Sequence, residues 1–287
     1  MYTSALIEFT ASLKRAIETS IETKGIDAGD QKYWATVLLT NICSIASSIL
    51  FICPRSILNE RGLSWSLESV AALARSVFEG ILMVFYLGLE PVPTDEWKVR
   101  ITLVHLADCT ERIRLFTHLG DQETVARFVG TAVDLRSRLT ANPAFAAMGK
   151  KNEYLSGERA TLFGKAEIIK RMQEDSEDAL YFYRFMSNYL HSLPFGFHRT
   201  GEHKRDGTEN EVDKFYIAMT LQFTAKWLDR ITAEFQKAFA NCVTYGKGGF
   251  DFRVMTIPAF SKREQAMIDR VFSAKGELAV VKYGRRW

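Results

Sequence analysis

Four hydrogen-bonding side chains share one face of a predicted helix in the second half of the sequence. They stand at positions i, i+3, i+4 and i+7 and are Arg184, Ser187, Asn188 and His191, a spacing that aligns them along one helical stripe. An arginine and a histidine on one stripe could cleave RNA without a metal ion. A neutral imidazole would take the proton of a ribose 2′-hydroxyl, and the guanidinium would offset charge that builds on the phosphoryl oxygens. Arg184 and His191 are therefore candidate catalytic residues, and Ser187 and Asn188 are candidates for positioning the phosphate.

The same side chains also have a purely structural interpretation. His191 could hydrogen-bond Ser187 one turn back, and Arg184 could pair with a buried acid such as Glu79. Ion pairs of this kind are common inside helical bundles, and ionisable groups mark functional sites only statistically. At the level of the sequence both interpretations are open.

A second polar line lies within another strongly apolar segment. Arg75 and Glu79 are four residues apart in the run A-A-L-A-R-S-V-F-E-G-I-L-M-V-F-Y, so they share a helical face and could form an ion pair. Their apolar neighbours predict burial, where an unpaired charge is costly. We expect this line to face the stripe of Arg184 and His191, which would create either a pocket or a closed polar network. Arg75 and Glu79 are thus candidate binding residues.

The helix that carries the first stripe is predicted to run from Ser176 to Pro194. Ser176 is the expected N-cap, Glu177 and Asp178 follow in the first turn, where the helix dipole favours anions, and Pro194 ends the helix. The remaining faces are apolar, which is typical of a buried helix. Buried polar groups need partners, so the stripe should face other polar groups or a ligand.

The rest of the chain predicts an all-α fold, a multi-helix bundle. Apolar residues recur at spacings of three and four in segment after segment, and Gly or Pro separates many of the segments. Asp30, Thr94 and Asp121 are expected to start three helices, and T-E-N-E at 208–211 has the pattern of a capping box. The predicted helices span about 3–23, 30–52, 64–89, 94–119, 121–142, 164–175 and 208–239, with a mostly irregular connection containing one short helix at 143–164.

A domain boundary is predicted at the run Gly246-Lys247-Gly248-Gly249. Residues 1–245 would form the helical bundle domain, and residues 246–287 would form a small C-terminal appendage. The appendage could contain a short strand pair around one helix, because F-D-F-R-V-M-T-I-P and E-L-A-V-V-K-Y are rich in strand-forming residues.

Several classes of chemistry lack their sequence signatures. There is no phosphate-binding G-x-x-x-x-G-K-[ST] loop, no G-x-G-x-x-G, no H-E-x-x-H and no G-x-S-x-G. The histidines have no carboxylate or cysteine at a diagnostic offset, so neither a metal site nor a cofactor is expected. The formal net charge of +3 is spread along the chain, which disfavours a nucleic-acid-binding tail but leaves room for a local basic patch.

The expected location is the cytoplasm. The four cysteines are scattered without a C-x-x-C pair, which argues against a disulfide framework. The N-terminal segment contains Glu8 within its apolar part and lacks the basic lead of a signal peptide. The uncharged run Val37 to Cys53 contains five Ser, Thr and Asn residues and is shorter than the roughly 20 residues that span a bilayer. We therefore interpret it as a core helix and expect no membrane partner.

Two short motifs together resemble a known group of proteins. The segment R-S-x-F-E-x6-Y-L from Arg75 to Leu87, paired with Y-x-x-x-S-x-x-x-H from Tyr183 to His191, is similar to an uncharacterised group of bacterial all-helical proteins related to the HEPN superfamily. The resemblance covers about Ser64 to Tyr245. Active HEPN proteins are RNases of toxin and defence systems that use an R-x4-6-H motif, two copies of which meet across a dimer. The resemblance implies roles for Arg184 and His191 alone; Phe185 follows the arginine here, where HEPN nucleases commonly carry a polar residue.

Two further hypotheses compete with a metal-independent RNase. One is a non-catalytic helical scaffold whose polar stripe only specifies packing, and the other is a bundle that binds a small molecule at the same polar residues. RNA and a second copy of the chain are the partners that the RNase hypothesis implies. A scaffold would lose stability on mutation of the stripe, whereas an enzyme would lose activity.

Overall fold

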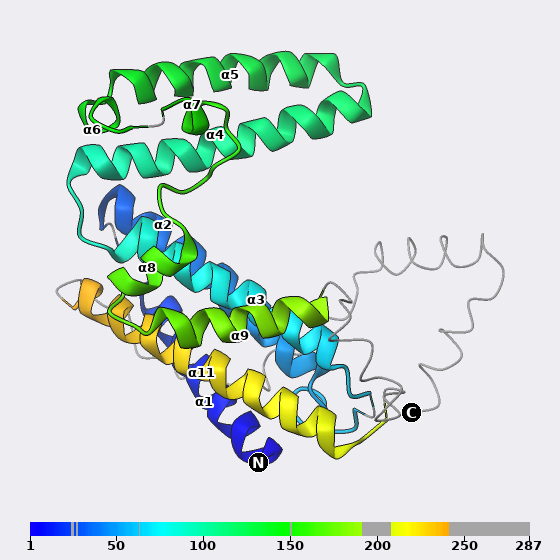
Figure 1. The fold of residues 1–287 in the computed structure, drawn as a ribbon. Helices are drawn as coiled ribbons and strands as arrows, with labels where there is room; N and C mark the ends of the chain where they lie inside the picture. Colours follow the sequence, from blue (N-terminus) through cyan, green and yellow to red (C-terminus); the bar gives the residue numbers. More distant parts are fainter. Residues whose placement is uncertain (24–25, 27, 63, 150, 191–207, 241–287) are drawn as a thin grey trace. The chain divides into compact units, whose positions relative to one another are not determined.

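The structure is a computed structural model of the whole chain, and it describes residues 1–23, 26, 28–62, 64–149, 151–190 and 208–240. Within these residues the regular elements are helices and none is a strand, so the predicted all-α multi-helix bundle is confirmed. The elements, labelled as in Figure 1, are α1 (Tyr2–Glu22), α2 (Gly29–Ile52), α3 (Leu67–Val84), the π-helix η1 (Phe85–Leu89), α4 (Thr94–Leu119), α5 (Gln122–Ala141), α6 (Pro143–Ala146), α7 (Lys151–Leu155), α8 (Lys165–Arg171), α9 (Ser176–Leu190) and α11 (Glu211–Phe239).

Helix α3 is the central packing element. It contacts α2, α9 and α11, while α1 packs along α11 and α2. Its apolar residues recur every three or four positions, so Val77, Phe78 and Ile81 are buried on its inner faces. The Phe78 ring lies 4.9 Å from the indole of Trp227 and 5.3 Å from the ring of Phe223 on α11. Because a buried side chain of this size contributes about 1.5–3 kcal/mol, this contact fixes α11 against α3.

The sequence predicts the extent of most helices well, but several helices are capped by residues other than the predicted ones. Helix α2 begins at Gly29, so Asp30 lies in its first turn instead of capping it, and α4 has Pro93 rather than Thr94 at its N-cap. Asp30 still favours the helix, because a carboxylate in the first turn interacts with the dipole. Asp121 does cap α5, since its side chain accepts a hydrogen bond from the Thr124 amide.

Two further caps are displaced from their predicted residues. Asp175, and not Ser176, accepts hydrogen bonds from backbone amides at the start of α9, the shorter being 2.8 Å from the Glu177 nitrogen. At α11 the N-cap is Asn210, which accepts from the Asp213 amide at 2.8 Å and donates to the Asp213 carboxylate at 2.7 Å. The N-cap and its N3 partner are therefore Asn210 and Asp213, two residues later than the predicted Thr208 and Glu211, because several residues in this stretch are able to cap a helix.

The connection at 143–164 holds two short helices, α6 and α7, where one was predicted. The helix predicted over 164–175 is present but shorter, since α8 ends at Arg171. The helix predicted over 64–89 is present but is not an α-helix throughout. Helix α3 ends at Val84, and the chain continues as the π-helix η1 to Leu89.

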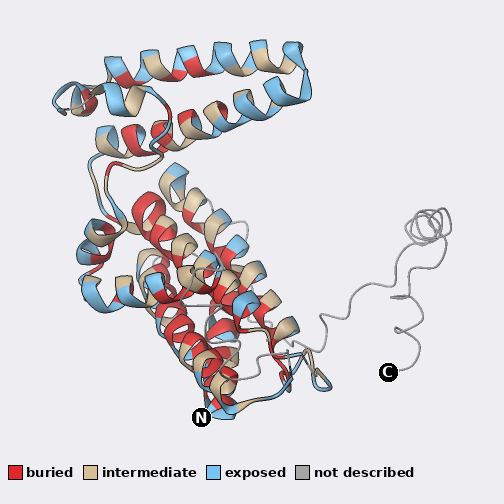
Figure 2. Ribbon diagram, turned by 45° about the vertical axis from the view of Figure 1, so that its right-hand side comes forward, coloured by how far each residue is buried: buried red, intermediate tan, exposed pale blue. Residues whose placement is uncertain are grey.

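Helices α4 and α5 form a hairpin with a small core of its own. Figure 2 shows buried residues on both helices and mostly exposed residues toward the loop that joins them, and several of the exposed residues are apolar. The packed residues are Val99, Leu103, Leu106, Cys109, Ala132, Leu135, Leu139, Phe145 and Leu162. The exposed ones are Leu115, Leu119, Val129 and Val133.

Helix α2 and the stretch formed by α3 and η1 are long and apolar enough to cross a membrane, judged by length and composition alone. Core helices of soluble proteins pass the same test. In the structure, α2 and α3 pack against each other, and Gly88 of η1 fits closely against α2, since a methyl group there would come 2.4 Å from the Ala35 Cβ.

The chain divides into two compact units, Met1–Phe250 and Asp251–Trp287. All the helices above belong to the first unit. The second unit, and with it the predicted strand pair of the C-terminal appendage, lies outside the described residues.

Candidate functional site

Arg75 and Glu79 on α3 meet Tyr183 on α9. Arg75 Nη2 donates to Tyr183 Oη at 2.8 Å, and Tyr183 Oη donates to Glu79 Oε1 at 2.8 Å. Arg75 Nη2 also lies 3.5 Å from Glu79 Oε1. Three polar side chains from two helices thus form one hydrogen-bonded group, with the tyrosine hydroxyl as both donor and acceptor.

Lys165, the first residue of α8, adds a second cation to this group. Its Nζ lies 3.3 Å from Glu79 Oε1 and 4.8 Å from the centre of the Tyr183 ring. The Arg75 guanidinium lies 4.9 Å from the same ring, so two cations contact one aromatic ring. We call Arg75, Glu79, Lys165 and Tyr183 the α3–α9 cluster.

The α3–α9 cluster is partly open to solvent. The exposed fraction of the side chain is 17% for Arg75, 37% for Glu79 and 40% for Lys165. Ion pairs at such exposure contribute at most about 1 kcal/mol, so solvent can compete for these groups. A ligand with hydrogen-bonding atoms could do the same.

The other predicted residues of α9 lie in different environments. Arg184 is exposed, and no ion pair joins it to another described residue. Ser187 is half-buried and donates from Oγ to the Tyr183 carbonyl oxygen at 2.8 Å, a bond within the helix. Asn188 is half-buried. His191 directly follows the last residue of α9 and lies outside the described residues, so its role remains a prediction.

Tyr183 and Lys165 were absent from the site that the sequence predicts. Tyr183 could have been found, because Tyr183, Ser187 and His191 stand at i, i+4 and i+8 and define a line beside that of Arg184. Lys165 gives no such signal. Lys165 is far from Glu79 along the chain, and the two residues come into contact only because α8 packs beside α3.

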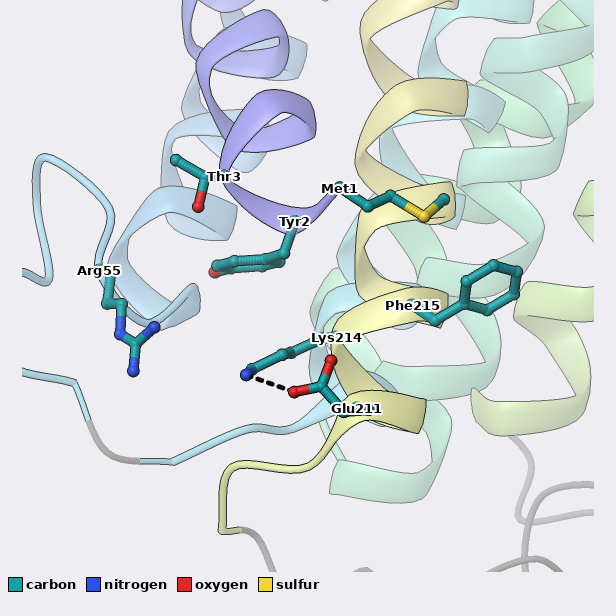
Figure 3. Close-up of a pocket in the computed structure, with 7 residues that line it drawn as sticks. All are labelled: Met1, Tyr2, Thr3, Arg55, Glu211, Lys214 and Phe215. Atoms are coloured by element: carbon teal, nitrogen blue, oxygen red, sulfur yellow. Dashed lines mark hydrogen bonds and ion pairs between the residues drawn. The ribbon is translucent and has the colours of Figure 1, made fainter.

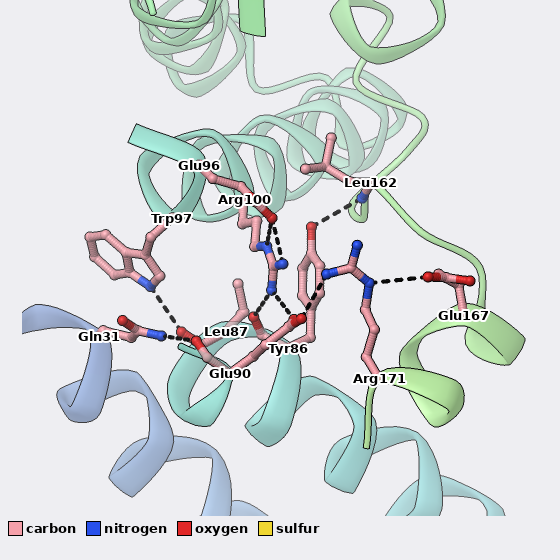
Figure 4. Close-up of polar contacts among 10 residues, drawn as sticks. All are labelled: Gln31, Tyr86, Leu87, Glu90, Glu96, Trp97, Arg100, Leu162, Glu167 and Arg171. Atoms are coloured by element: carbon pink, nitrogen blue, oxygen red, sulfur yellow. Dashed lines mark hydrogen bonds and ion pairs between the residues drawn. The ribbon is translucent and has the colours of Figure 1, made fainter. Parts of the chain in front are cut away.

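A second polar group surrounds Arg100, whose side chain is completely buried (Figure 4). Its Nη1 donates to Glu90 Oε2 at 2.5 Å and to the Tyr86 carbonyl oxygen at 2.7 Å. Its Nη2 donates to Glu96 Oε1 at 2.6 Å. Arg171 of α8 takes the other oxygen of Glu90 at 2.7 Å, and that contact contributes to raising the pKa of Arg171.

The carbonyl groups at the end of η1 need hydrogen-bond donors from other elements. The last carbonyl groups of a helix have no partner within it. Here Arg100 donates to the Tyr86 carbonyl oxygen. The indole nitrogen of Trp97 donates to the Leu87 carbonyl oxygen at 2.8 Å, and the Gln31 side chain donates to the Glu90 carbonyl oxygen at 2.8 Å (Figure 4). The Arg100 group therefore joins α2, η1, α4 and α8, and its charges are paired internally. We interpret it as a structural joint.

A pocket of about 360 Å³ lies where the start of α1 meets the start of α11 (Figure 3). Its two cations already have acidic partners. Lys214 Nζ lies 2.6 Å from Glu209 Oε1 and 2.8 Å from Glu211 Oε1, and Arg55 Nη2 lies 2.6 Å from Glu209 Oε2. The lysine holds the pKa of Glu209 below its usual value. A ligand would have to compete with these pairs, so this pocket is the weaker candidate.

Cysteine and metal chemistry find little support among the residues that the structure describes. Burial raises the pKa of Cys43 and of Cys53 to about 12, so both thiols are neutral and poor nucleophiles near pH 7. No group of three or more His, Cys, Asp or Glu residues in the described ranges is arranged to hold a metal ion.

Comparison with known proteins gives no match: no protein-family model, no curated protein and no solved structure is similar to this chain.

Proposed function

We propose that this chain is a HEPN-like, metal-independent RNase that acts at the α3–α9 cluster and the adjoining stripe of α9. The proposal rests above all on the convergence of Arg75, Glu79 and Tyr183 from two helices at a surface that solvent reaches. In this proposal the catalytic residues are Arg184 and His191. Arg75, Glu79, Ser187 and Asn188 bind and orient the RNA.

The charges near the cluster suit a phosphodiester. Arg75 and Lys165 lie within the cluster, and Arg184 is exposed one residue after Tyr183. Guanidinium groups form paired hydrogen bonds with phosphate oxygens, and each cation that contacts RNA releases counterions from its backbone. A phosphate drawn toward these cations would lie close to the α9 stripe, where the Asn188 amide can donate a hydrogen bond; Ser187 can donate one only by releasing its bond to the Tyr183 carbonyl oxygen.

The proposed reaction is an internal transfer of the phosphodiester. His191 takes the proton of a ribose 2′-hydroxyl, the 2′-oxygen bonds to phosphorus, and the bond from phosphorus to the 5′-oxygen breaks. The departing 5′-oxygen takes a proton from solvent or from the imidazolium. Arg184 offsets the charge on the phosphoryl oxygens. The products are a 2′,3′-cyclic phosphate and a free 5′-hydroxyl.

Homodimerisation is part of the proposal, because HEPN nucleases pair two copies of their motif. Light scattering on the full chain tests this part separately. A mass of two chains at micromolar concentration supports a homodimer. A monomeric mass at every concentration at which the chain still cleaves RNA contradicts a homodimer.

A second candidate function, a non-catalytic scaffold, is favoured by one specific contact. The Tyr183 hydroxyl already has a donor in Arg75 and an acceptor in Glu79. A group that is satisfied within the protein needs no ligand, and such networks can serve to specify packing.

Cleavage of a fluorescent single-stranded RNA by the full chain, in the presence of EDTA, separates the two candidates. If the chain is an RNase, Arg184→Gln and His191→Ala should each lower cleavage about 100-fold or more and leave the thermal midpoint unchanged. Lys226→Gln is the matched control, because Lys226 is an exposed cation of α11 with no described partner. Absence of cleavage by the unmodified chain, with loss of stability in the α9 variants, would favour the scaffold.

A further inference from the structure

A cavity of about 580 Å³ separate from the α3–α9 cluster lies between α2, α4 and α5. Pockets for small molecules usually have volumes of about 300–1,000 Å³ and mainly apolar walls. Aromatic side chains form much of this wall: Tyr33 and Trp34 from α2, and Trp97 and His105 from α4. We call this cavity the aromatic pocket.

The walls of the aromatic pocket are held in place by neighbouring contacts. The Trp97 indole nitrogen is bonded to the Leu87 carbonyl at 2.8 Å, which fixes the ring. Trp34 contacts His105 edge to face, with ring centres 5.5 Å apart, and joins α2 to α4. Buried Val99 and Leu139 belong to the same lining. Aromatic rings held in this way can stack against a planar ring with little loss of side-chain entropy.

The charged residues at the opening of the pocket determine which charge its ligand should carry. Lys98, Arg138 and Asp30 line the pocket and are exposed, and none forms an ion pair with another residue in the described part of the chain. Two cations against one carboxylate favour an anion. They also disfavour a bound organic cation, although aromatic walls alone would suit one.

His105 adds a neutral polar group. Burial, the largest effect, lowers its pKa; the Asp108 charge acts in the opposite direction, and the Arg138 charge acts in the same direction as burial. A neutral imidazole can donate one hydrogen bond and accept another, so it can contact a ring edge or a hydroxyl. By contrast, the Asn142 side chain is already bonded to the Asp95 carbonyl and to the amides of two residues that follow it.

We propose that the aromatic pocket binds a small aromatic anion, with its planar ring against Trp34 and Trp97 and its phosphate or carboxylate at Lys98 and Arg138. A nucleoside phosphate and an aromatic carboxylate share this chemistry. The site is independent of the proposed RNase activity.

Calorimetric titration of the full chain tests the proposal with two charged probes, AMP and indole-3-acetate, and with their partial analogues adenosine, indole and inorganic phosphate. At least one charged probe should bind, and its uncharged analogue and phosphate alone should bind at least about tenfold more weakly. Arg138→Gln and Lys98→Gln should each weaken the charged probe about tenfold. Arg127→Gln, an exposed arginine of α5 outside the pocket, should not change binding.

Binding of AMP alone identifies a nucleoside phosphate as the ligand class, and binding of indole-3-acetate alone identifies an aromatic carboxylate. Failure of both probes to bind at millimolar concentration would overturn the proposal. It would also be overturned if the uncharged analogues bound as tightly as the anions, or if Arg127→Gln weakened binding as much as Arg138→Gln. The thermal midpoint of each variant is measured first, so that loss of binding is not confused with unfolding.

Discussion

Tyr183 on α9 donates a hydrogen bond of 2.8 Å to Glu79 on α3. This bond joins two residues that are 104 positions apart in the chain. It also places a tyrosine, and not the neighbouring arginine, against the acid that the sequence suggested as a partner for Arg184. The exposed guanidinium of Arg184 is thereby left available for other contacts.

Removal of this hydroxyl should measure how much the cluster contributes to stability. We expect Tyr183→Phe to lower the free energy of unfolding by about 1 kcal/mol, since the hydroxyl loses its bonds to Arg75 and Glu79 while the ring and the direct Arg75–Glu79 ion pair remain. Urea denaturation gives the value. Tyr181→Phe is the control, because Tyr181 is 67% exposed on the same helix. Equal stabilities of the two variants would show that the cluster does not hold α9 in place.

A much larger effect is expected at the buried joint. Arg100→Met removes the cation that faces Glu90 and leaves the Tyr86 carbonyl without its donor. Breaking a buried pair costs about 3–5 kcal/mol when the remaining charge has no partner. Glu90 keeps its contact with Arg171, so we expect a loss near the lower end of this range. Chemical denaturation should show this loss, whereas Arg112→Gln on the exposed surface of α4 should stay within about 0.5 kcal/mol of the unmodified chain. A stable Arg100→Met variant would contradict the role of the joint.

Two glycines should respond to alanine in opposite directions. At Gly88 a methyl group would come 2.4 Å from the Ala35 Cβ and 2.7 Å from its Cα, so the backbones would have to separate. We expect Gly88→Ala to destabilise the fold by about 1–3 kcal/mol. Gly130 lies within α5 with open space around it, and Gly130→Ala should stabilise the helix by about 0.5–1 kcal/mol. Thermal unfolding of both variants checks the sign, and a Gly88→Ala variant at least as stable as the unmodified chain would refute the packing described for η1.

The helices were predictable because their apolar residues repeat with helical spacing, and this pattern does not depend on partners. Their capping residues were less predictable. Asp175 and Ser176 can both cap a helix, as can Thr208 and Asn210, and the choice depends on where neighbouring helices hold the chain. The π-helix η1 had no signal, because it is completed by Arg100 and Trp97, which lie beyond its end.

The candidate site was predictable in part for a similar reason. Periodicity placed Arg75 and Glu79 on one face, and they do lie together. On α9, Tyr183 and Arg184 are adjacent residues that point about 100° apart around the helix. Only the packing of α9 on α3 decides which of them faces Glu79, and the rotation of α9 about its own axis cannot be read from a single sequence.

The nature of the cleaved RNA ends tests the central proposal most directly. Mass spectrometry of the products of a single-stranded RNA, incubated with the full chain and EDTA, should show 2′,3′-cyclic phosphates and 5′-hydroxyls. The same RNA with one 2′-deoxyribose at the cleaved position should resist cleavage there, and His191→Ala should leave both substrates intact. Cleavage of the deoxy-substituted position, or products formed equally by His191→Ala, would contradict the account.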